Sequence, residues 1–190
     1  MEICENGEVF GENKSERVKL ALKVATEIHH EDIRKTTGEP YVNHCVAVAS
    51  ILEKWGADED EVVAGLLHDT WEDHPELINL EIIEEIFGAR VAFLVDGVTK
   101  LKTRKGEKSE FETLQKVTRE SLIDVGVAKI KLADRKHNMM TLEGMKPETT
   151  KKKAKETLTV YAPLAESFGM WQIKKELEDL AFRYFDPERY

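Results

Sequence analysis

Three separated segments of the chain carry side chains that commonly bind divalent metals. His44 lies in PYVNH, His68 and Asp69 are adjacent in LLHDTWED, and Asp134 lies in IKLADRKHN. Two imidazoles and two carboxylates suit a divalent transition metal and leave coordination positions for water and substrate. A lone histidine at a helix end is more often structural. Here, however, leucines precede the His68–Asp69 pair on an apolar helix, where unpartnered polar groups are costly to bury. Metal coordination would supply the partners.

A second acidic pair follows the His68–Asp69 dipeptide. Glu72 is four residues after His68 and Asp73 is four residues after Asp69, so on a helix these carboxylates project beside the possible ligands. Like charges at this spacing repel, so the arrangement is destabilising without a cation and reasonable with one. An exposed acidic helix end is the alternative interpretation, because acidic patches on helix surfaces are common.

The segment around Asp134 adds a polar side chain and three positive charges. Asn138 lies one helical turn after Asp134 and could contact a ligand beside the metal. We expect Arg135 to form an ion pair with one of the acidic site residues. Lys131 and Lys136 are expected to be ordinary surface side chains that extend along the helix.

Helices must position these residues, because the apolar residues recur at helical spacing and rarely alternate with polar ones. Ser15 is a plausible N-cap for the first helix, and Pro163 should kink or interrupt the helix that contains it. The pattern favours an all-α architecture. The predicted helices cover about residues 15–30, 43–55, 58–71, 80–87, 89–99, 109–124, 127–142 and 154–168, and a last helix carries Ile173, Leu177, Leu180, Ala181 and Tyr184 on one stripe.

Length, composition and charge limit the class of protein. The 190 residues, 41% of them hydrophobic, are enough for one substantial core and predict one domain. The formal net charge of −9 opposes binding to nucleic acid, which requires a basic face. The sequence has no apolar stretch long enough to cross a bilayer and its acidic start is unlike a signal peptide, so we expect a cytoplasmic protein without a membrane partner. Cys4 and Cys45 lack a metal-ligand spacing, and neither is a catalytic candidate.

Local basic clusters could still hold a small anion. Arg34 and Lys35 lie in the polar segment 31–40, whose glycine and proline suit a surface loop, and residues 100–108 read KLKTRKGEK. For residues 100–108, a solvated loop is favoured over an anion-binding site. For Arg34 and Lys35, these two interpretations are balanced.

The order His44, His68–Asp69, Asp134 resembles the H…HD…D signature of the HD superfamily of metal-dependent phosphohydrolases. Most of the chain resembles, more narrowly, the hydrolase region of the RelA/SpoT alarmone enzymes. The strings that carry this resemblance are RKTTGEPYVNH, LLHDTWED, FGARVAFLVDGVTKL, IKLADRKHNMMTL and ETLTVYAPLAESFGMWQIKKELEDLAF. The resemblance implies a single HD-domain helical bundle over residues 1–190. We expect a flexible N-terminus at 1–14, and C-terminal helices at 154–190 like those that connect to a synthetase domain, which we expect to be absent.

The resemblance also implies an activity and a set of roles. The activity is hydrolysis of the 3′-pyrophosphate of ppGpp and pppGpp to GDP or GTP and pyrophosphate, which lowers the alarmone of the stringent response. The substrate is a small guanosine nucleotide, and the cofactor is one manganese ion. The implied metal ligands are His44, His68, Asp69 and Asp134; the catalytic pair is Glu72 and Asp73; and Arg34, Lys35, Asn138 and Thr141 lie near the nucleotide. Glu39, Pro40 and Tyr41 are expected to shape the loop rather than to make contacts.

The sequence departs from the family pattern at four positions, none of them an implied ligand. Cys45 replaces a usual proline, Trp71 a usual aliphatic residue, Lys136 a common leucine and Met140 a common arginine. Two other functions remain open: an enzyme of the same fold that removes the 2′-phosphate of NADPH, and a module that senses alarmone without cleaving it. The ligand set would also accept zinc, iron or cobalt, so the preference for manganese comes from the resemblance.

Overall fold

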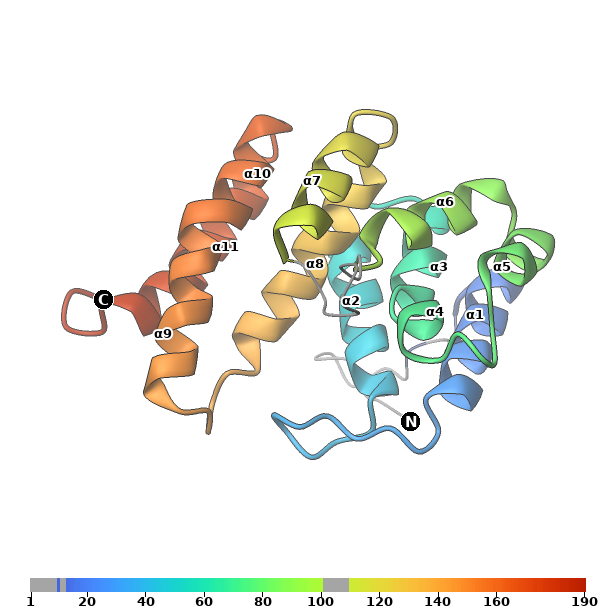
Figure 1. Cartoon of the computed structure of the whole chain (residues 1–190), viewed down its shortest axis with the longest axis horizontal. Coiled ribbons are helices and arrows are strands. Elements are labelled where there is room, and N and C mark those ends of the chain that lie inside the picture. The colour runs from blue at the N-terminus through green and yellow to red at the C-terminus, as the bar shows by residue number, and fades with distance from the viewer. Residues whose placement is uncertain (1–9, 11–12, 101–109) are drawn as a thin grey trace. The chain divides into compact units, whose positions relative to one another are not determined.

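The computed structural model describes residue 10, residues 13–100 and residues 110–190, and the regular elements in these ranges are all helices (Figure 1). The predicted all-α architecture is therefore confirmed. No helix in these ranges is both long and apolar enough to cross a membrane. The expected flexible N-terminus at 1–14 lies mostly outside the described residues, and so does the basic segment that follows Lys100.

The chain divides into two compact units. The first contains the described residues up to Arg34 and those from Glu39 to Ile130, and the second contains residues 35–38 and 131–190. That the two belong to one domain stays a prediction. The helices of the first unit are α1 (Glu16–Ile28), α2 (Val42–Lys54), α3 (Glu59–Leu67), α4 (Thr70–Asp73), α5 (Leu80–Phe87), α6 (Ala89–Val98) and α7 (Glu110–Ser121). Helix α8 (Gly126–Met140) begins in the first unit and continues into the second, which also holds α9 (Pro147–Glu156), the π-helix η1 (Thr157–Tyr161), α10 (Ala162–Ser167) and α11 (Trp171–Phe185).

Helix α3 is the central helix of the first unit. Its sequence from Val62 to Leu67 is apolar on every side, which is typical of a fully buried helix, and every residue of this stretch is buried. The helix packs against α1, α2 and α6 (Figure 1). At its start, the Asp58 carboxylate accepts a hydrogen bond from the Glu61 N–H while the Glu61 carboxylate accepts one from the Asp58 N–H. This capped, buried helix leads directly into His68 and Asp69.

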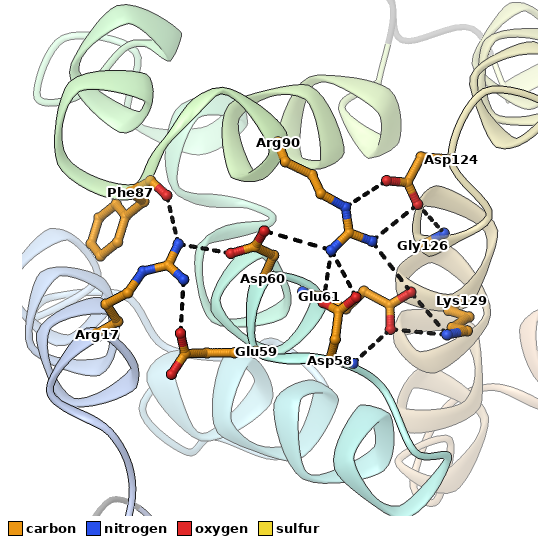
Figure 2. A network of polar contacts seen from close by, with 10 residues as sticks. All are labelled: Arg17, Asp58, Glu59, Asp60, Glu61, Phe87, Arg90, Asp124, Gly126 and Lys129. Carbon is orange, nitrogen blue, oxygen red and sulfur yellow. Dashed lines mark hydrogen bonds and ion pairs between the residues drawn. The ribbon is translucent and has the colours of Figure 1, made fainter.

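Arg17 ties α1 to the neighbouring helices of the first unit. Figure 2 shows its guanidinium in contact with Glu59 and Asp60, the first two residues of α3. Its nitrogens lie 2.7 Å from a carboxylate oxygen of Glu59 and 2.7 Å from one of Asp60, and a third bond of 2.7 Å reaches the carbonyl of Phe87 at the end of α5. The predicted cap at Ser15 is confirmed, since its side chain accepts from the Val18 N–H.

A second arginine joins α6 to the start of α3 and to the turn before α8. The Arg90 guanidinium donates to Asp58 at 2.7 Å and to Asp124 at 2.7 Å (Figure 2). Lys129, on the first turns of α8, lies 2.9 Å from both carboxylate oxygens of Glu61, whose side chain is only 2% exposed. We call Arg90, Asp58, Glu61, Asp124 and Lys129 the Arg90 network. Each of its acids faces a cation of the protein.

The second unit has a core of its own, in which α11 packs against α9, η1 and α10. One cluster of its buried apolar side chains consists of Met139, Leu142, Ala154 and Ala181. Helix α9 begins at Pro147, earlier than the predicted start at Ala154, because proline is well tolerated in the first turn of a helix.

The predicted interruption at Pro163 is confirmed by the π-helix η1, which ends just before it. Proline has no N–H to donate to the carbonyl of Thr159, four residues earlier. The preceding N–H, that of Ala162, bonds to the Thr157 carbonyl five residues back, which is the π pattern.

Candidate active site

Two of the predicted metal ligands, His44 and His68, come together where α2 packs on the end of α3. Both side chains are almost completely buried, their ring centroids are 5.1 Å apart, and each offers a nitrogen within 4.8 Å of the other. Gly65 permits the close helix contact, because a Cβ there would lie 2.5 Å from the Leu52 side chain on α2.

The hydrogen bond of His68 fixes which of its nitrogens can bind a ligand. Its Nδ1 lies 2.8 Å from the Gly65 carbonyl oxygen, and a carbonyl only accepts, so Nδ1 must carry the proton. The other nitrogen, Nε2, lies 2.9 Å from Oδ2 of Asp69. A carbonyl bond of this kind commonly orients a metal-binding histidine.

Asp69, the residue after His68, completes this group. Its Oδ2 is 3.8 Å from Nε2 of His44 and accepts a 2.6 Å hydrogen bond from the Tyr41 hydroxyl. Burial alone would raise the pKa of Asp69, but its attraction to His68 and Lys100 outweighs burial and holds the pKa well below the usual range. We call His44, His68 and Asp69 the His-Asp site.

Tyr41, which was expected to shape the loop, also contacts two residues of the His-Asp site. Its ring packs edge-on to His44, with centroids 5.4 Å apart, and its hydroxyl fixes one oxygen of Asp69. No spacing in the sequence signals this contact, because the two residues are 28 positions apart. The thiol of Cys45, beside His44, is fully buried; burial raises its pKa well above the usual range, as expected for an inert cysteine.

The prediction of one continuous helix over residues 58–71 is wrong, because α3 ends at Leu67 and α4 begins at Thr70. The backbone angles of Asp69, φ −103° and ψ −8°, differ from those of a regular helix. Side chains satisfy the carbonyls that the break exposes, since Thr70 Oγ1 donates to the Leu67 carbonyl at 2.7 Å. The break places His68 and Asp69 in a turn between two helices.

Glu72 and Asp73, the predicted catalytic pair, lie on α4 in different environments. The side chain of Glu72 is 3% exposed, and its two oxygens are 2.9 Å from the ammonium and from the backbone N–H of Lys100. Asp73 is exposed, and its N–H bonds to the Asp69 carbonyl. Lys100 is thus an additional candidate residue, which the sequence suggested only as one member of a basic cluster.

Arg34 lies in the loop between α1 and α2. The loop is closed by the backbone bonds from Arg34 N–H to the Glu39 carbonyl and from Tyr41 N–H to the Asp32 carbonyl, both 2.9 Å long. Arg34 is buried, and its guanidinium carbon lies 5.8 Å from the centre of the Tyr41 ring. Lys35, its neighbour, is exposed and belongs to the second unit.

Asp134, Asn138 and Thr141 belong to the second unit, where α8 continues to its end. Asn138 donates to an oxygen of Asp134 at 2.5 Å, so the predicted neighbours on one helix face do meet. The Thr141 hydroxyl donates to the His137 carbonyl at 3.1 Å.

The three basic residues near Asp134 differ from expectation. Arg135 pairs with Glu156 at 3.1 Å and stacks over the Tyr161 ring at 3.8 Å, so its partner is not an acidic site residue. Lys131 is buried and lies 3.4 Å from Asp134. Lys136 pairs with Glu176 at 2.7 Å. These lysines make ion pairs rather than simply extending into solvent, because Lys131 reaches an acid one turn along the same helix and Lys136 reaches one 40 residues away in the sequence.

The atoms of the His-Asp site fit a divalent cation. An imidazole nitrogen and a carboxylate oxygen both present lone pairs, so their approach to 2.9 Å in a buried position requires a positive charge between them. A proton can supply it, and so can a metal ion, for which two imidazoles and a carboxylate are a common ligand set.

The fold and the site together define a class of protein. The model of the HD domain matches residues 21–171, a range that includes all four predicted ligands, and the chain belongs to the HD domain family.

Relatives within the family are similar over most of this chain. The guanosine-3′,5′-bis(diphosphate) 3′-pyrophosphohydrolases of Haemophilus influenzae and Aquifex aeolicus are 46% and 45% identical, over 85% and 93% of the chain. The bifunctional (p)ppGpp synthase/hydrolase SpoT of Escherichia coli is 41% identical over 94% of it. The chain spans only 24%, 25% and 26% of these proteins, about a quarter of their length.

A solved structure agrees with these similarities. It is described as a metazoan ortholog of SpoT that hydrolyses ppGpp, and it matches 92% of this chain and 97% of its own with a TM-score of 0.67 and 25% identity. A Listeria monocytogenes protein, lmo0812, shares the fold with a TM-score of 0.57 and 24% identity.

Proposed function

We propose that this chain hydrolyses the 3′-pyrophosphate of ppGpp and pppGpp, giving GDP or GTP and pyrophosphate, with manganese as its cofactor. The observation that carries the proposal is the convergence of His44, His68 and Asp69 beside the buried Glu72. Similarity to named 3′-pyrophosphohydrolases over 85% or more of the chain supports the choice of substrate.

The proposed metal ligands are His44, His68, Asp69 and, from α8, Asp134. A divalent ion held by these residues would polarise a phosphoryl oxygen and lower the pKa of a water molecule. The Tyr41 hydroxyl holds one oxygen of Asp69, and the Gly65 carbonyl holds the ring of His68, so two of the ligands are oriented before any ion arrives.

Glu72 is proposed to orient the attacking water and accept its proton. Its ion pair with Lys100 favours the carboxylate form, which is the form that can accept a proton. The water oxygen bonds to the phosphorus attached to the ribose 3′ oxygen, the bond between that phosphorus and O3′ breaks, and a proton passes to O3′. Exposed Asp73 is proposed to share in these proton transfers from the solvent side of α4.

The remaining predicted residues are proposed to bind the nucleotide. Arg34 or Lys35 would offset phosphate charge, and Arg34 lies in the closed loop with its guanidinium near the Tyr41 ring. Asn138, in the last turn of α8, would position the sugar or phosphate, and Thr141, just after the end of that helix, would lie near the nucleotide.

Metal-stripped protein, incubated with ppGpp with and without manganese, tests the proposal. Chromatography should show GDP and pyrophosphate in equal amounts only when metal is present, and parallel reactions with zinc, cobalt and iron would establish the metal preference. Release of phosphate from NADPH without cleavage of ppGpp would contradict the substrate. Tight binding of ppGpp without products would show a sensor rather than an enzyme.

A further inference from the structure

A second group of metal-binding side chains lies in the first unit, apart from the proposed ligands. His29 follows the end of α1, Asp32 lies in the next loop and His74 follows α4. Oδ2 of Asp32 is 2.7 Å from Nδ1 of His29 and 2.6 Å from Nε2 of His74. We call these three residues the His29 cluster.

The side chains of this cluster are held in place by packing. The His29 side chain is fully buried, with its ring centroid 4.8 Å from that of Tyr41 and 5.3 Å from that of His74. Asp32 and His74 are partly open, at 34% and 22% exposure, so an ion could enter from solvent. A rigid buried ligand beside two accessible ones is a preorganised arrangement for metal binding.

The distances suit a small transition metal after a minor adjustment. One ligand atom from each residue lies within 4.8 Å of the other two. A tetrahedral ion with bonds of about 2.0–2.1 Å separates its ligands by about 3.3 Å, so each of the two short contacts must lengthen by less than about 1 Å. Nδ1 of His74 is 3.1 Å from a carboxylate oxygen of Glu76, which fixes the ring from its other side.

We propose that His29, Asp32 and His74 form a second metal site that takes a zinc-class divalent ion, with water in the remaining position. Two imidazoles and one carboxylate are a ligand set that such ions accept. Without an ion, hydrogen bonds from both imidazoles to Asp32 hold the cluster, and those to Asp32 and Glu76 raise the pKa of His74. Binding therefore replaces protons with metal.

Counting zinc ions per chain tests this proposal, provided that the His-Asp site is counted separately. Protein stripped of metal is dialysed against buffered zinc, and bound metal is measured by elemental analysis. We expect two ions in the parent chain, one in Asp69→Ala and one in His74→Ala. The matched control is His30→Ala, because His30 is exposed and adjacent to His29 but outside the cluster, and it should retain two.

Affinity and coordination make the test specific. In the Asp69→Ala background, His74→Ala and Asp32→Asn should each weaken zinc binding by about 100-fold or more. X-ray absorption of zinc in that background should show two imidazole ligands. Circular dichroism identifies any variant that fails to fold. If His74→Ala does not fold, Asp32→Asn replaces it in the test, because asparagine keeps the shape of the aspartate side chain. One zinc in the folded parent chain that is lost in Asp69→Ala and kept in His74→Ala, or two in folded His74→Ala, would overturn the proposal, and neither result depends on alarmone hydrolysis.

Discussion

Charged side chains are dense in two regions of the first unit, the Arg90 network and the His-Asp site, but their partners differ. In the network, Asp58, Asp124 and Glu61 face an arginine or a lysine at 2.7 to 2.9 Å (Figure 2). In the His-Asp site, Asp69 faces two imidazoles and a tyrosine hydroxyl.

This difference separates structural charge from functional charge. An arginine is always protonated and offers no lone pair, so its acids are neutralised permanently and can only hold helices together. An imidazole can release its proton and give its lone pair to a metal. The chemical type of the partner, more than the number of charges, therefore marks the region that can exchange a proton for an ion.

Replacing Asp69 should have the largest effect and tests whether the His-Asp site is functional. Asp69→Ala removes one ligand and leaves Tyr41 without its acceptor, so manganese affinity should fall by at least about 100-fold and turnover should be lost with it. Calorimetric titration with manganese and the chromatographic assay measure the two effects. Unchanged metal affinity in folded Asp69→Ala would remove this residue from the ligand set.

Replacing Glu72 should separate chemistry from metal binding. Glu72→Gln keeps the size of the side chain but cannot accept a proton, so turnover should fall by about 10²–10³-fold while manganese affinity stays nearly constant. Glu85→Gln on the exposed face of α5 is the matched control and should behave like the parent chain. A Glu72→Gln enzyme with full activity would exclude the proposed proton acceptor.

Replacing Arg90 should affect stability and leave the site intact. Arg90→Ala removes the cation shared by Asp58 and Asp124, and because the arginine side chain is 37% exposed we expect a loss of about 1–2 kcal/mol in the free energy of unfolding. Urea unfolding measures it. The control Arg119→Ala, whose side chain is 71% exposed, should change stability by less than about 0.5 kcal/mol. A large fall in manganese affinity in Arg90→Ala would mean that the two regions are not independent.

Lowering the pH should weaken the Arg90 network, and this is the smallest of the expected effects. The hydrogen bond from Arg90 lowers the pKa of Asp124. Burial alone would raise the pKa of Asp58, but the hydrogen bonds that it accepts from the Glu61 N–H and from Arg90 outweigh burial and lower it. Groups with lowered pKa contribute stability above the unfolded value, near about 3.9, and lose it as the pH falls through the folded value. The parent chain should therefore lose stability below about pH 4 more steeply than Arg90→Ala, by less than about 1 kcal/mol. Urea midpoints from pH 3 to 7 measure this, and parallel curves would contradict it.

The elements that position the site could be predicted because they depend on local patterns. Apolar spacing locates α2 and α3, Ser15 marks the start of α1, and Pro163 marks the interruption of the C-terminal helices. The break between α3 and α4 could not be predicted, since His68 and Asp69 are compatible with a helix and only their surroundings in the folded chain open the turn.

Contacts between distant segments account for the rest. Tyr41 reaches Asp69 across 28 residues, and Lys100 reaches Glu72 across the same number. His74 and Asp32 meet across 42 residues. Sequence spacing describes one helix or one turn at a time, so it cannot show partners that tertiary packing brings together.

Gly65 lies outside the ligand set, yet it affects which ion the site can accept. A Cβ at this position would lie 2.5 Å from the Cδ1 atom of Leu52, so a larger residue requires the Leu52 side chain to repack or α2 and α3 to separate. Because His44 belongs to one helix and His68 follows the other, that separation sets the span between their imidazoles. At the proposed site, the radius of the preferred ion would therefore depend partly on core packing, and a substitution that touches no ligand would be expected to change the metal preference.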